Sequence, residues 1–214
     1  MLEASTVWNT EGSKVTVRTR TLSFKLATKL ATVSLLVAAS ACGKPFNIKP
    51  RGEVKTAEYA AAAEPATILI EGIALTDEDF LYDTFNANLL LAGVLPVRVR
   101  MTNNSDAEVR LRRERFELRA GRRTLKSIEA DRAFKRLLSF YGVSIYNRVG
   151  YKQSREALRS YELDFGKTVR PGSTCDGVIF FESRPQVETN SALVLVAKGL
   201  GGSDSKSLLE LKLK

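Results

Sequence analysis

The sequence has no histidine and only two cysteines, Cys42 and Cys175, among its 214 residues. Without imidazole, the usual histidine metal sites and every catalytic triad with a histidine base are excluded. Two cysteines are too few for a disulfide scaffold or for a zinc site built from thiolates. We therefore expect no metal, no other cofactor and no enzyme activity. A hydrolase that pairs a serine with a lysine is the alternative that composition leaves open, although no such pair stands out.

Long apolar runs are also missing near the amino terminus, where the apolar stretch covers only residues 30–41 (LATVSLLVAASA). Twelve residues are too few for a permanent membrane helix, which needs about 20. A short apolar run behind a basic region is typical of a secretory signal peptide, which we expect over residues 1–41. The basic residues of that region are Arg18, Arg20, Lys25 and Lys29. They include no adjacent arginine pair, so the general secretory route is expected.

The end of this apolar run carries a cleavage pattern. Ala39-Ser40-Ala41 fits the small-x-small rule of signal cleavage. With Cys42 it resembles the lipobox of bacterial lipoproteins, although Ala39 stands where leucine is usual. The resemblance implies acylation of Cys42, including palmitate, and a lipid anchor in the membrane. Gly43 in place of aspartate resembles the outer-membrane sorting pattern, which implies a lipoprotein that faces the periplasm. The alternative is a soluble secreted domain in which Cys42 pairs with Cys175.

The chain is basic, with a formal net charge of +9, of which about +6 remains after Cys42. A moderately basic surface suits anionic lipid, acidic polysaccharide or a protein partner as well as nucleic acid. Because an exported protein rarely meets nucleic acid, we do not expect nucleic acid to be a partner. Residues 42–65 combine proline, glycine, charge and an alanine run without a core-like period, and this composition predicts a flexible tether after the lipidated cysteine.

The rest of the chain, residues 66–214, is dominated by a two-residue alternation of apolar and charged side chains, which predicts half-buried strands. The alternation is clear around Val99, Leu163 and Leu211. More uniformly apolar segments at 67–75, 177–182 and 193–197 predict central strands. Turn residues separate the segments, as in Asn103-Asn104-Ser105-Asp106, Ala120-Gly121 and Arg170-Pro171-Gly172-Ser173. Seven or so short strands of this kind predict a mainly β fold, an antiparallel β-sandwich.

Residues 127–141 break the alternation, because apolar side chains recur there at helical spacing between lysines and arginines. A second short helix is predicted from Gln153 to Tyr161. We interpret residues 127–159 as a helical insertion that caps one end of the sandwich.

Several segments together resemble a known domain type. They are Gly93-Val94-Leu95-Pro96-Val97 running into Asn103, then Phe116-Glu117-Leu118, and later Arg170-Pro171-Gly172 with the strand that begins at Gly177. They are similar to the immunoglobulin-like domain of small bacterial envelope lipoproteins, and more distantly to the water-stress domain of late embryogenesis abundant proteins. The likeness covers residues 89–214 and implies an immunoglobulin-like sandwich with no catalytic residues. The helical stretch is longer than such domains need.

The most distinctive charged feature is a set of seven arginines within fourteen residues, here called the arginine cluster: Arg110, Arg112, Arg113, Arg115, Arg119, Arg122 and Arg123. Guanidinium groups suit phosphate and carboxylate, so the cluster is a candidate anion-binding site. The alternative is that these side chains face solvent on two strands and pair with neighbouring glutamates. Asp77-Glu78-Asp79 lacks the spacing of a calcium loop and predicts a solvated turn.

These features favour a non-enzymatic lipoprotein, anchored in the membrane of the bacterial envelope, that binds or braces an envelope protein or glycan. One alternative is direct binding of anionic lipid or lipopolysaccharide through the arginine cluster. The other is the soluble secreted domain described above.

Overall fold

A computed structural model describes residues 43–53, 61–63, 68–183, 192–200 and 208–213 of the chain. The predicted signal peptide and Cys42 lie outside the described residues. The chain divides into two compact units, Met1–Cys42 and Gly43–Lys214, and the second contains all the elements below. These are η1 Arg51–Glu53, β1 Ala61–Ala63, β2 Ile68–Ala74, α2 Glu78–Phe85, β3 Val94–Asn103, β4 Val109–Arg110, η2 Arg113–Arg115, β5 Phe116–Ala120, β6 Arg123–Ile128, α3 Ala130–Phe140, α4 Arg148–Tyr161, β7 Thr168–Val169, β8 Thr174–Glu182, β9 Leu193–Lys198 and β10 Leu208–Leu213.

Eight strands form one antiparallel sheet in the order β1-β2-β3-β8-β6-β5-β9-β10, and β4 pairs separately with β7. The sheet bends at β6, whose first part pairs with β5 while Ser127 and Ile128 pair with β8. The two halves therefore face each other, with side chains such as Val99, Leu118 and Leu195 in the core between them. The predicted mainly β, antiparallel sandwich is confirmed.

The two ends of the sheet also meet, because β10 packs against β1 and β2. Gly72 of β2 makes this approach possible. A side chain there would begin 2.9 Å from Cδ2 of Leu211 and 3.0 Å from Cδ2 of Leu213. The sandwich is therefore nearly closed, which protects edge strands that would otherwise be open to pairing with other chains.

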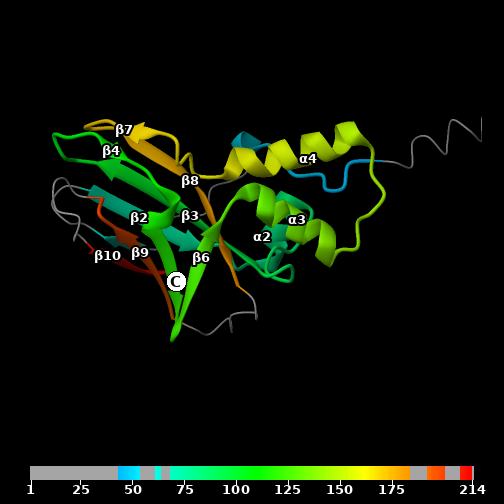
Figure 1. Ribbon diagram of the computed structural model, residues 1–214, viewed down its shortest axis with the longest axis horizontal. Helices are drawn as coiled ribbons and strands as arrows, with labels where there is room; N and C mark the ends of the chain where they lie inside the picture. Colours follow the sequence, from blue (N-terminus) through cyan, green and yellow to red (C-terminus); the bar gives the residue numbers. More distant parts are fainter. Residues whose placement is uncertain (1–42, 54–60, 64–67, 184–191, 201–207, 214) are drawn as a thin grey trace, which may run out of the picture. The chain divides into compact units, whose positions relative to one another are not determined.

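The helices cover the outer face of the sheet at one end, and they enclose a second core (Figure 1). Val178 and Phe180 of β8 point into this second core, whereas Ile179 and Phe181 point into the first. Burial on both faces explains the apolar run from Val178 to Phe181 in β8, as expected for a central strand. The predicted helical cap is therefore present, and it also includes α2. A solvated turn was predicted at Asp77-Glu78-Asp79, but α2 begins there, at Glu78.

Capping groups explain where the helices begin. Asp77 precedes α2, and its carboxylate accepts a hydrogen bond of 2.8 Å from the Phe80 amide. Asn147 precedes α4, and its side-chain oxygen accepts a 2.5 Å hydrogen bond from the Gly150 amide. The amide of Ala130, at the start of α3, donates to Glu162 at 2.8 Å. A glutamate distant in sequence therefore caps α3, a role that the local pattern does not reveal.

One predicted strand is wrong. The alternation of Tyr161, Leu163 and Phe165 predicts a strand, but Tyr161 is the last residue of α4 and the following residues contribute only an isolated bridge from Glu162 to Val178. Tyr161 packs on Phe85 in the second core, whereas Leu163 belongs to the first. The apolar spacing arises because the chain passes from one core to the other.

Candidate functional site

Residues 43–53 pack on the rest of the domain, whereas a flexible tether was predicted over residues 42–65. Phe46 and Ile48 are only 4% and 7% exposed. The Phe46 ring meets Phe134 of α3 edge-on at 6.0 Å between centroids, and it meets Tyr141 at 5.9 Å. Phe46 and Ile48 are therefore part of the second core, and β1 occupies a further part of the predicted tether.

Hydrogen bonds hold this segment along its length. The Ser154 hydroxyl of α4 donates to the Phe46 carbonyl at 2.6 Å. The Lys49 amide donates to the Thr84 carbonyl of α2 at 2.9 Å, and the Tyr161 hydroxyl donates to the Lys49 carbonyl at 2.7 Å. Because these bonds pair the backbone polar groups of an otherwise irregular strip, the strip can be buried without losing hydrogen bonds.

A close backbone contact fixes the beginning of the segment. A side chain on Gly150, in the first turn of α4, would begin 2.9 Å from the Cα atom of Lys44 and 3.0 Å from the Gly43 carbonyl oxygen. Only glycine leaves room for this approach. The residue directly after Cys42 is therefore already held against α4.

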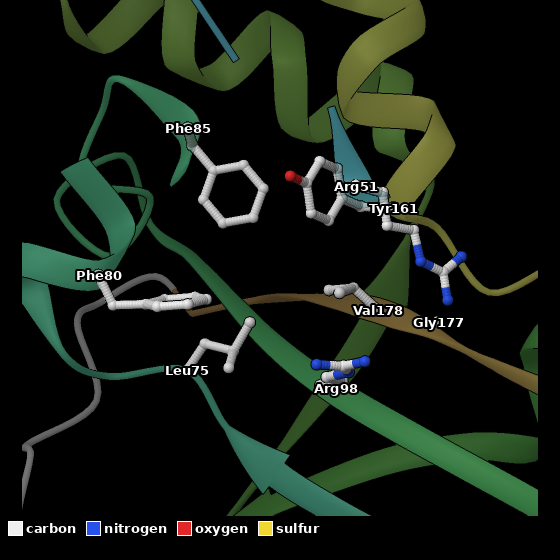
Figure 2. Close-up of a pocket in the computed structure, with 8 residues that line it drawn as sticks. All are labelled: Arg51, Leu75, Phe80, Phe85, Arg98, Tyr161, Gly177 and Val178. Carbon is white, nitrogen blue, oxygen red and sulfur yellow. The ribbon is translucent and has the colours of Figure 1, made fainter. Parts of the chain in front are cut away.

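The other end of the segment closes a small cavity between the helical layer and the sheet. Figure 2 shows the rings of Phe80, Phe85 and Tyr161 around it, with the guanidinium groups of Arg51 and Arg98 at one side. The cavity measures about 30 Å³, which is the space of a single water molecule. It is too small for a substrate.

Asp176, beside this cavity, joins the segment to the sheet. Its carboxylate lies 2.5 Å from Nη2 of Arg51 and 3.4 Å from Nη2 of Arg98, and its carbonyl accepts a 2.9 Å hydrogen bond from Arg51. Burial raises the pKa of Asp176, but the hydrogen bonds and charges of Arg51 and Arg98 outweigh this and hold the pKa below its usual value. The site therefore fastens Arg51 to β3 and β8.

Tyr141 provides a second link across the helical layer. Its hydroxyl accepts a hydrogen bond of 2.8 Å from the Asn88 amide. Burial, followed by a hydrogen bond with Tyr82, raises the pKa of Tyr141 to about 12. Tyr141 therefore stays neutral and ties the end of α3 to the loop after α2.

The arginine cluster is divided by the fold. Arg113 donates to Glu162 and to the Ile128 carbonyl, both at 2.9 Å, and it lies 4.4 Å from the Phe165 ring centroid. Arg115 donates to the Gly199 carbonyl at 2.7 Å, and Arg119 pairs with Glu210 at 2.6 Å. Arg112 lies 3.9 Å from Glu114, while Arg110, Arg122 and Arg123 are exposed. Anion binding by the cluster stays a prediction, but Arg113, Arg115 and Arg119 are engaged within the domain.

The remaining candidates have ordinary structural surroundings. Cys175 is partly buried on β8, and burial raises the pKa of its thiol, so the reactive thiolate is disfavoured. Across the part of the chain that the structure describes, no group of histidine, cysteine, aspartate or glutamate residues could hold a metal ion. Within the same part, no helix has the length and apolar character to cross a membrane. Most of the glycine-rich loop after Gly199 lies outside the described residues.

The exposed side of α4 forms an open basic hollow of about 240 Å³, lined by Arg148, Tyr151, Lys152, Arg155, Glu156 and Arg159. Arg155 and Arg159 also reach Asp131 of α3, and the hydrogen bond from Arg155 lowers the pKa of Asp131. The helix predicted from the sequence begins at Gln153, five residues after the observed start at Arg148, so this surface was not among the predicted sites. The recurrence of Arg148, Lys152 and Arg159 at near-helical spacing is the signal that could have found it.

A further hollow of about 660 Å³ lies at β7 and is lined by Glu108, Lys167, Thr168, Val169, Arg170, Ser173 and Thr174. It is open and polar, and its residues lie at the far end of the strands from the helical layer (Figure 1). Its charged lining residues are two basic and one acidic, against four basic and one acidic on α4, so it is less suited to an anion than the surface of α4.

No protein family model matches the chain, and no curated protein matches it either. Among solved structures, ycdA, a predicted lipoprotein of Bacillus subtilis, is 13% identical with a TM-score of 0.42, over 74% of this chain and 39% of that one. The yjhA protein of Bacillus subtilis is 12% identical with a TM-score of 0.40, over 73% of this chain and 98% of that one. A protein of unknown function from Listeria monocytogenes is 8% identical with a TM-score of 0.33, over 72% and 82% of the two chains. The chain spans well under half of ycdA. Likenesses this weak assign neither a family nor a function.

Proposed function

We propose that the protein is a non-enzymatic lipoprotein of the bacterial envelope, anchored through an acylated Cys42, whose folded domain binds or braces another envelope component. Gly43 in place of aspartate favours the outer membrane and a domain that faces the periplasm. The observation that carries the proposal is the position of the domain boundary. The compact unit begins at Gly43, the residue that directly follows the candidate lipidation site.

This boundary fits removal of the signal peptide before Cys42. Cleavage there would leave the second core intact, because Phe46 and Ile48 stay on the mature chain with their contacts. Cleavage a few residues later would remove Phe46 and leave a hole beside Phe134. The packing of residues 43–53 therefore supports processing at Cys42.

The test is the intact mass of the protein extracted from membranes of a bacterial host. We expect a chain that starts at Cys42 and carries acyl groups. Cys42→Ser should abolish acylation and release the protein from membranes, whereas Cys175→Ser, the matched control, should leave both unchanged. An unmodified wild-type chain would refute the anchor and favour a soluble secreted domain.

A binding role, rather than catalysis, is supported by the chemistry of the described residues. The small cavity beside Arg51 has room for about one water, and burial raises the pKa of the Cys175 thiol, which disfavours the thiolate. Crosslinking in intact envelopes tests this part of the proposal. We expect defined adducts with a protein or glycan, and a protein that yields no adduct in intact cells would contradict it.

A further inference from the structure

Large apolar side chains are exposed together around the connection from α3 to α4. The exposed fractions are 45% for Phe140, 79% for Ile145, 37% for Tyr146 and 66% for Val149. These four residues, here called the apolar face, lie within ten residues of one another in the sequence. A group of exposed apolar side chains is typical of a surface that contacts something other than water.

The apolar face lies beside the start of the mature chain. Val149 is adjacent to Gly150, against which Gly43 and Lys44 pack. Figure 1 shows the segment that starts at Gly43 at the same end of the domain as the α3–α4 connection. Gly43 directly follows Cys42 in the sequence. A lipid on Cys42 would therefore be covalently joined to the end of the domain that carries the apolar face.

Positive charge surrounds this face. From Arg132 to Arg155 the chain contains six basic residues and no acidic residue. Arg148, Lys152 and Lys44 are all exposed near the apolar side chains, and the Lys152 side chain is 75% exposed. Two acidic side chains border the face among the described residues. Glu78 of α2 acts on the Tyr141 hydroxyl, and Oε1 of Glu156 lies 3.9 Å from Nζ of Lys152. Apolar side chains with basic neighbours are the composition of surfaces that lie in the headgroup layer of anionic bilayers.

We propose that the apolar face docks on the anionic bilayer that holds the Cys42 anchor. Ile145 and Val149 enter the interfacial layer, and Lys44, Arg148 and Lys152 contact lipid phosphates. The inference rests on the proposed function, because the anchor keeps the face at high local concentration beside the bilayer. Four exposed apolar side chains are then enough for docking. Docking at this end points the β4–β7 sheet away from the membrane, where a partner can reach it.

The composition of the chain provides a clean probe. The only tryptophan is Trp8, which precedes Cys42, so the mature protein has none. Ile145→Trp reports on the apolar face, and Leu208→Trp, at a 50% exposed position on β10, is the matched control. Each acylated variant is reconstituted into vesicles of phosphatidylglycerol and phosphatidylethanolamine that contain brominated lipid, after circular dichroism shows that it folds like the wild type.

We expect brominated lipid to quench the Ile145→Trp emission and shift it to the blue, and to leave Leu208→Trp unaffected. Adding Arg148→Glu and Lys152→Glu to the Ile145→Trp variant should weaken docking by about fivefold or more per residue at low salt. High salt should have a similar effect, because it screens the same charges.

The outcomes separate this inference from the proposed function. An acylated protein whose Ile145→Trp emission is unquenched refutes the docking face but leaves the anchor intact. Shielding from aqueous acrylamide without quenching by brominated lipid would assign the face to a protein or a second copy instead of a bilayer. An unacylated Cys42 would refute both proposals.

Discussion

Replacing Phe46 by alanine tests whether the segment after Cys42 belongs to the core. Phe46 is 4% exposed and packs edge-on against Phe134 and Tyr141. Removing a buried phenylalanine ring costs about 3–5 kcal/mol in lost burial and residual cavity. We expect the lower end of this range, about 3 kcal/mol, because the segment can detach locally and so limit the loss. With a urea m-value of about 2 kcal/mol/M, the midpoint should fall by about 1.5 M.

The assay is urea unfolding of the mature protein, followed by circular dichroism. Ile145→Ala is the control, since Ile145 is 79% exposed and its loss should change the free energy of unfolding by less than about 0.5 kcal/mol. Protease should also cut the Phe46→Ala protein faster within residues 43–53. If Phe46→Ala unfolds at the same urea concentration as the wild type, the segment is a tether and the folded domain does not begin directly after Cys42.

Three further predictions use the same unfolding measurement. Gly150→Ala should destabilise the protein by about 1–3 kcal/mol, because the new methyl group would lie 2.9 Å from the Cα atom of Lys44. Gly52 has open space around it, so the control Gly52→Ala should change the free energy of unfolding by less than about 0.5 kcal/mol. Asn103→Ala should lower the free energy of unfolding by about 2–3 kcal/mol, since the buried side-chain amide donates at 2.8 Å to the Ala107 carbonyl. A smaller loss would imply that a water molecule takes the place of the amide. The pKa of Asp176 is lowered on folding, so its contribution to stability is complete above about pH 4 and is lost as the pH falls through the lowered value. Asp176→Asn should therefore destabilise the protein at pH 7 and lose less stability than the wild type between pH 4 and pH 2, and equal losses would contradict the pairing with the arginines.

The strands were predictable because their signal is local. Alternation around Val99 and Leu211 arises from burial of one face, and the apolar runs of β8 and β9 mark strands that have a neighbour on each side. The hairpin at Gly121 was predictable for a similar reason, since a backbone φ of 56° there favours glycine. Such features depend on residues that are neighbours in the sequence.

The site was less predictable because its contacts join distant residues. Phe46 and Ile48 are only two apolar residues between prolines, and their burial depends on α3 and α4, about a hundred positions later. Arg51 has no local feature that indicates Asp176 as its partner. The arginine cluster is compact in the sequence, but the fold pairs Arg113 with Glu162 and Arg119 with Glu210, and neither partner is near these arginines in the sequence.

By itself the sequence determined the excluded chemistry, the expected export signal and the antiparallel β architecture, because composition, short motifs and side-chain periodicity need no knowledge of distant contacts. Only the tertiary structure decided that the domain begins directly after Cys42 and that a basic, apolar face lies beside that point. The physical reason is that burial, ion pairing and exposure depend on which segments meet in space. Phe46 becomes a core residue, and Ile145 stays on the surface, only once α3, α4 and the strip after Cys42 are packed together.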